Sequence, residues 1–232
     1  MQIKYSKLTS IDMDIPALFL SIENSFLLST SLAPLWLTLI LVVIQVTDRA
    51  AVLLPSLLAV FILCGIVVSW VALPHIAFSV WVFGLFATLI LYLSVRKLIP
   101  RTTPQINLQE RGYRLLIGLA LGIVAYLIGS FAAFPTGHAA VSSTIWALLT
   151  LGGLRFSTAN RSTEMGIGLL LILSGMGVWL TGVNGSAIIL GLWAAGTILL
   201  ALAVGWLTDR TEGAEGEMPI IHDQASIVNR HS

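Results

Sequence analysis

The sequence predicts an all-α protein, a polytopic transmembrane helix bundle with about seven spans. Of its 232 residues, 57% are hydrophobic and 10% are charged, a composition too apolar for an ordinary soluble domain. The charges are also segregated, because Asp, Glu, Lys and Arg are absent from 50–95, 115–154 and 165–208. A helix needs about 20 apolar residues to cross roughly 30 Å of hydrocarbon. Each block therefore accommodates two spans, and a further apolar segment precedes the first block.

The individual elements follow from these apolar runs and from the breaks between them. The predicted spans are residues 31–47, 50–72, 76–95, 113–132, 138–154, 165–182 and 186–207. In the fourth span, Gly118 and Gly122 form a small-xxx-small pair that predicts close helix packing.

The two ends of the chain are predicted to lie outside the spans. Residues 1–30 form an N-terminal tail, in which 15–30 is apolar but interrupted by Glu23. We interpret that segment as an interfacial amphipathic helix, and without a basic region and a cleavage site it does not resemble a signal peptide. Residues 209–232 are polar and acidic and are predicted to be a disordered cytoplasmic tail.

Alternate loops differ in charge, and this difference predicts the orientation. One set of connections carries all the basic residues that lie between or directly after spans, namely Arg49, Arg96, Lys97, Arg101, Arg111, Arg114, Arg155, Arg161 and Arg210. The other set, 73–75, 133–137 and 182–185, has no Lys or Arg. Because basic loops stay in the cytoplasm, we predict a multi-pass protein of the inner (plasma) membrane with its N-terminus outside and its C-terminus cytoplasmic.

Three polar residues, His75, His138 and Asn184, are predicted to lie on the outer face. Histidine is uncommon at membrane depth and often carries chemistry there. Pro135, Thr136 and Gly137 form a turn directly before His138. The alternative is that His138 only starts a helix and that Asn184 belongs to an ordinary tight turn.

Two segments resemble signatures of a known family. Phe134-Pro-Thr-Gly-His138-Ala-Ala resembles the PSGHA signature of the type 2 phosphatidic acid phosphatase (PAP2) superfamily, which comprises integral membrane lipid phosphatases. The run 180–196 resembles that family's last signature through its matching glycines, valine, leucine and tryptophan. The resemblance implies a PAP2-like six-helix membrane domain at 50–208, with 31–49 as an extra transmembrane helix.

The residues at the family's functional positions depart from its pattern. The resemblance implies a histidine nucleophile with an orienting aspartate, a second histidine as general acid, and phosphate bound by basic residues. The matching positions hold His138 for the general acid, Asn184 for the nucleophile, Ile188 for the aspartate and Val178 for the last arginine. Lys97 and Arg101 have the composition of the first signature but fall on the cytoplasmic side. His138 is therefore interpreted as a vestigial general-acid position and Asn184 as a substituted nucleophile position.

These departures predict a non-catalytic protein. Phosphoryl transfer depends on positioning and on charge stabilisation, and an asparagine amide does not replace imidazole as a nucleophile. We expect lipid or isoprenoid binding near His75, Thr136 and Gly137, or a role as a subunit of a membrane complex. The expected partners are membrane lipids and other membrane subunits, with no cofactor, metal or nucleic acid.

Two alternatives remain open. One is an active PAP2-type phosphatase of lipid or isoprenyl phosphates with a site rewired around His138 and His75. The other is a small transporter component with a path lined by Ser142, Ser143 and Thr144, although helical hydroxyls usually bond to their own backbone.

Overall fold

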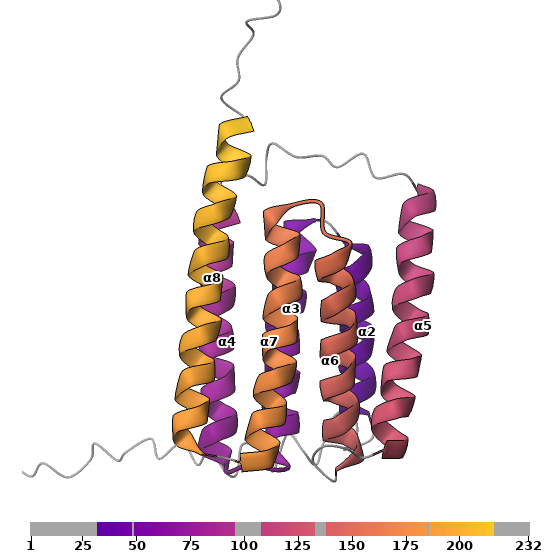
Figure 1. Cartoon of the computed structure of the whole chain (residues 1–232), viewed down its shortest axis with the longest axis vertical. Helices are drawn as coiled ribbons and strands as arrows, with labels where there is room; N and C mark the ends of the chain where they lie inside the picture. Colours follow the sequence, from indigo (N-terminus) through magenta and orange to yellow (C-terminus); the bar gives the residue numbers. More distant parts are fainter. Residues whose placement is uncertain (1–31, 48, 96–107, 133–137, 185, 216–232) are drawn as a thin grey trace, which may run out of the picture.

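The computed structural model of the chain describes residues 32–47, 49–95, 108–132, 138–184 and 186–215. Within these residues every regular element is an α-helix, so the predicted all-α bundle is confirmed (Figure 1). The helices are α2 (Ala33–Val46), α3 (Ala50–Ser69), α4 (Pro74–Val95), α5 (Leu108–Ala132), α6 (Ala139–Ser157), α7 (Ser162–Asn184) and α8 (Ala187–Glu215). Each helix overlaps one predicted span, and the predicted interfacial helix lies outside the described residues.

Six of the helices, α3 to α8, are long and apolar enough to cross a membrane. Helix α2 is apolar but has only 14 residues. It rises about 21 Å, which is less than the roughly 30 Å of a hydrocarbon core. It ends before the predicted span does because Thr47 adopts an extended backbone, with φ −100° and ψ 124°. The described part of the chain thus has six full-length spans and a short additional helix.

Several helices extend beyond their predicted spans, and α5 and α8 do so farthest at a single end. Helix α5 begins before the predicted boundary, and Arg114 forms an ion pair of 2.8 Å with Glu110 one turn earlier. Helix α8 continues through 209–215, so this part of the predicted disordered tail is helical, and 216–232 lie outside the described residues. Hydropathy marks only the membrane-embedded length, whereas backbone hydrogen bonds and pairs of side chains four residues apart continue a helix into water.

All charged residues in the described part of the chain lie at one end of the bundle. Successive helices run in opposite directions (Figure 1), so the C-termini of α2, α4, α6 and α8 meet the N-termini of α3, α5 and α7 at this charged end. The residues are Arg49, Glu110, Arg111, Arg114, Arg155, Arg161, Glu164, Asp209, Arg210, Glu212 and Glu215. We call the opposite end, where α4, α6 and α8 begin, the uncharged end.

The helices form two layers. Figure 1 shows α5, α6, α7 and α8 in one layer, with α2, α3 and α4 behind them. Across the layers α4 packs on α8, α3 on α6 and α7, and α2 on α5 and α6. Helix α5 lies at the edge of its layer and packs mainly on α6 and α2 among the described helices.

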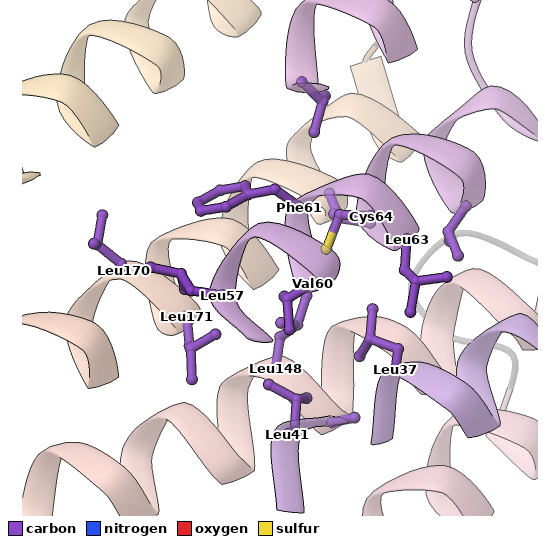
Figure 2. Close-up of a cluster of buried hydrophobic side chains, with 14 of the residues drawn as sticks. Leu37, Leu41, Leu57, Val60, Phe61, Leu63, Cys64, Leu148, Leu170 and Leu171 are labelled. Atoms are coloured by element: carbon purple, nitrogen blue, oxygen red, sulfur yellow. The ribbon is translucent and has the colours of Figure 1, made fainter. Parts of the chain in front are cut away.

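The core between the layers consists mainly of aliphatic side chains, together with Phe61, Cys64 and Trp193. Figure 2 shows Leu57 and Phe61 of α3 beside Leu170 and Leu171 of α7, with Leu148 of α6 close by. All five side chains are fully buried. In a membrane, neighbouring helices gain little from excluding water, so the fit of such side chains supplies much of their association.

Glycines on α5 allow its close approach to two other helices. A Cβ atom on Gly122 would lie 2.9 Å from Cγ2 of Thr38, and one on Gly118 would lie 3.3 Å from Cγ of Gln45. Both contacts are with α2, so the close packing predicted for this glycine pair is confirmed. Further along α5, a Cβ on Gly129 would overlap the backbone of Ser143 in α6.

The hairpins α3–α4 and α7–α8 use the same contact. The indole of Trp81 on α4 lies against Gly65 on α3, and Trp193 on α8 lies against Gly177 on α7. The Trp81 Nε1–H donates to the carbonyl of Ile62 at 2.8 Å, and the Trp193 Nε1–H donates to that of Leu173 at 2.9 Å. In each hairpin, the glycine provides the space in which the indole reaches a carbonyl of the neighbouring helix.

Candidate functional site

His138 lies at the uncharged end as the N-cap residue of α6. Its backbone is extended, with φ −107° and ψ 114°, and its carbonyl accepts the backbone N–H of Ser142 at 2.9 Å to begin the helix. Its imidazole does not cap the helix, and the residue is exposed. Thr136 and Gly137, which the sequence places beside it, lie outside the described residues.

Asn184 is the last residue of α7. Because α6 and α7 pack against each other as an antiparallel pair, the start of α6 and the end of α7 share the uncharged end. The backbone thus places His138 and Asn184 at the ends of neighbouring helices, as the sequence predicts.

The side chains at the other two positions matched to the family differ in burial. Val178 is 1% exposed and belongs to the hydrophobic core, whereas Ile188, in the first turn of α8, is 76% exposed. Both are apolar, so in the described residues neither position supplies a charge to the uncharged end.

His75 is the second residue of α4 and is exposed. Its carbonyl accepts the Ser79 hydroxyl at 2.8 Å. Helix α4 packs on α3 and α8, whereas α6 packs on α2, α3, α5 and α7. His75 and His138 therefore begin helices that are not main packing partners of each other, and a site shared by the two imidazoles stays a prediction.

The uncharged end presents apolar side chains instead of charges. Large exposed residues lie at four helix ends, and we call them the apolar rim: Leu73, Phe131, Val183 and Ile188. Among the described residues no group of three His, Cys, Asp or Glu side chains could hold a metal ion. Such a surface favours hydrocarbon or another apolar surface over a phosphate group.

Several hydroxyl groups inside the bundle donate hydrogen bonds to carbonyls of their own helices. The hydroxyls of Ser143 and Thr144 donate to the carbonyl of Ala140 at 3.0 and 2.9 Å. Those of Ser174 and Thr181 donate to carbonyls one turn earlier, at 2.7 Å in both cases. These donors are occupied, as the sequence leads us to expect, and this weakens the interpretation of Ser143 and Thr144 as a polar path.

A buried polar cluster at the charged end was not predicted. Arg155, near the end of α6, is 1% exposed. Its guanidinium donates to the carbonyl of Gln45 at 3.1 Å and to that of Thr47 at 3.2 Å, and it lies 3.7 Å from a carboxylate oxygen of Glu164 on α7. We call these four residues the Arg155 cluster.

The cluster joins the ends of three helices. The side-chain amide of Gln45 donates to the carbonyl of Leu151 on α6 at 2.7 Å, while Arg155 reaches back to α2. Carbonyls at a helix C-terminus lack intrahelical donors and carry partial negative charge, which a guanidinium compensates. Glu164, in the first turn of α7, also accepts the backbone N–H of Asn160 at 3.3 Å and sits where a helix favours negative charge.

The sequence contained a weak signal for this cluster. Arg155 directly follows an apolar block, so the sequence alone predicts it as a loop charge. However, Gln45 is an amide within an apolar span, and Glu164 begins the next one. Gln45, Glu164 and Arg155 therefore lie near the ends of three different spans on the same side of the membrane. Such an amide, carboxylate and guanidinium are candidates for pairing with one another.

No family model, curated protein or solved structure matches the chain. The fold itself defines the class, because six long apolar helices packed as a bundle, with their charges at one end, are the architecture of a multi-pass helical membrane protein.

Proposed function

We propose that this chain is a non-catalytic integral membrane protein with a PAP2-like core, which binds a lipid or isoprenoid chain at its uncharged end. The observation that carries the proposal is the chemistry of that end. Its described residues supply an apolar rim and two histidines on helices that are not main packing partners of each other, with no Asp, Glu, Lys or Arg.

The absence of cations argues against phosphate chemistry at this end. A phosphoryl group in transfer spreads negative charge over its oxygens, and stabilisation of that charge is the main catalytic contribution. Losing one stabilising donor costs on the order of 3 kcal/mol, or about a hundredfold in rate. The positions matched to an arginine and to an aspartate hold Val178 and Ile188, so several such contributions are missing together.

The proposed orientation places the uncharged end outside. The charged end carries Arg49, Arg111, Arg114, Arg161 and Arg210, and basic residues beside spans favour the cytoplasmic side. In the inner (plasma) membrane this leaves the apolar rim at the outer leaflet, where it meets lipid from that leaflet or an apolar surface of another membrane subunit.

Native mass spectrometry of the protein, extracted in mild detergent, tests the proposal. We expect a retained lipid or isoprenoid, and we expect the double variant Val183→Ala and Ile188→Ala, at the adjoining ends of α7 and α8, to lose most of it. Leu199→Ala is the matched control, because Leu199 is 64% exposed but lies in the middle of α8, away from the rim.

Two results would contradict lipid binding at the rim. One is that the rim variant and the control retain the same lipid in the same amount. The other is a co-purifying membrane protein, with no lipid, whose recovery falls only in the rim variant. That second result would instead assign the rim to a partner subunit.

A further inference from the structure

The hydrogen bonds that link α2 to its neighbours gather at its charged end. Gln45 donates to the carbonyl of Leu151, and Arg155 donates to the carbonyls of Gln45 and Thr47. Toward the uncharged end, the Thr38 hydroxyl donates within α2, to the carbonyl of Pro34 at 2.8 Å. The polar attachment of this short helix is therefore one-sided.

Part of the contact between α2 and α5 is formed by glycines. The α2 side chains Gln45 and Thr38 face Gly118 and Gly122 of α5, and this contact contains no hydrogen bond among the described residues. The α3–α4 and α7–α8 hairpins are also packed against glycines, but they are interlocked by an indole that donates a hydrogen bond to a carbonyl of the neighbouring helix. Apolar side chains of α2 are buried along its length, so the polar contacts with neighbouring helices are what distinguish its charged end.

The cost of burying Arg155 also points to a role other than stability. Removing a guanidinium and a carboxylate from water carries a large penalty, and apolar replacements of buried ion pairs are often neutral or stabilising. The rest of the core is mainly aliphatic and could have continued through this position. Buried pairs of this kind are best attested where they set a register or a switch.

From these observations we propose that the Arg155 cluster acts as a latch, by which we mean that its hydrogen bonds hold the charged end of α2 against α6. With the latch formed, α2 is held on α5 and α6, and the side chains beneath it are protected from water at the charged end. With the latch broken, the charged end of α2 moves away from α6, while the two interlocked hairpins stay in place.

Cysteine labelling measures this motion directly. Cys64 is the single native cysteine and is buried, so Cys64→Ala provides the background. Leu41→Cys places the probe on α2, one turn before Gln45, where the native side chain is fully buried. Leu91→Cys is the matched control, because Leu91 is 1% exposed and also lies about one turn from the charged end, on α4.

Each probe is combined with Arg155→Gln and treated with a polar maleimide in unsealed membranes. We expect the Leu41→Cys probe to react about ten to a hundred times faster with Arg155→Gln than without it, as expected when one or two hydrogen bonds to a charged donor are lost. The reaction at Leu91→Cys should keep its rate.

Three outcomes overturn the proposal. The first is unchanged labelling at Leu41→Cys in a folded Arg155→Gln protein. The second is equal acceleration at both probes, which would show that Arg155 supports the whole fold. If Arg155→Gln is not recovered folded, Gln45→Leu removes the milder half of the latch, and the third is that this variant leaves the Leu41→Cys rate unchanged.

Discussion

Replacing Gly129 by alanine tests a close approach between the backbones of α5 and α6. The added Cβ would overlap the backbone of Ser143 and would lie 2.7 Å from the carbonyl carbon of Ser142. Backbone atoms cannot rotate out of the way as a side chain can, so α5 and α6 must move apart. Overpacking of this kind costs about 1–3 kcal/mol, against a gain of up to about 1 kcal/mol from the better helix propensity of alanine.

Gly112 provides the matched control on the same helix. A Cβ at this position meets nothing within 4 Å, so Gly112→Ala should keep the propensity gain and pay no packing penalty. Unfolding in mixed detergent and SDS micelles gives the free energies of both variants. We expect Gly129→Ala to be less stable than the parent and Gly112→Ala to be equal or more stable. Equal stability of the two variants would contradict the close contact between α5 and α6.

Two further predictions concern burial and orientation. The thiol of Cys64 is 1% exposed, so a maleimide should label it only after unfolding in SDS, and rapid labelling of the folded protein would contradict the core packing around α3. In a Cys64→Ala background, Leu73→Cys and Arg210→Cys lie at opposite ends of the bundle. In sealed right-side-out vesicles an impermeant maleimide should label the cysteine at 73 alone, and labelling of only the cysteine at 210 would reverse the proposed orientation.

Much of the fold was predictable because it depends on hydropathy and charge, which can be followed along the sequence. Charge-free apolar blocks located all seven described helices, since a lipid-embedded backbone must satisfy its hydrogen bonds within each segment. The helix ends were less predictable. Helix α8 continues to Glu215, beyond its apolar segment, and hydropathy does not indicate where a helix ends in water. The length of α2 depended on the extended backbone at Thr47, for which the residue type carries no strong signal.

The candidate site was also predictable only in part. Topology alone placed His138 and Asn184 at one end, on a hairpin of neighbouring helices. It did not show that the helix begun by His75 packs mainly on α3 and α8, because the order of packing between layers depends on long-range fit. The pairing of Gln45 with Arg155 joins residues far apart in the chain, and the sequence contains only a weak signal of that proximity. The resemblance to the PAP2 superfamily stays a prediction.

Phosphate release is the measurement that tests the central claim most directly. Purified protein would be given phosphatidic acid and an isoprenyl pyrophosphate in mixed micelles, and the parent would be compared with His138→Ala. The non-catalytic proposal predicts that both proteins release phosphate no faster than protein-free micelles. Turnover by the parent that His138→Ala abolishes would contradict it and would establish a working site at the uncharged end.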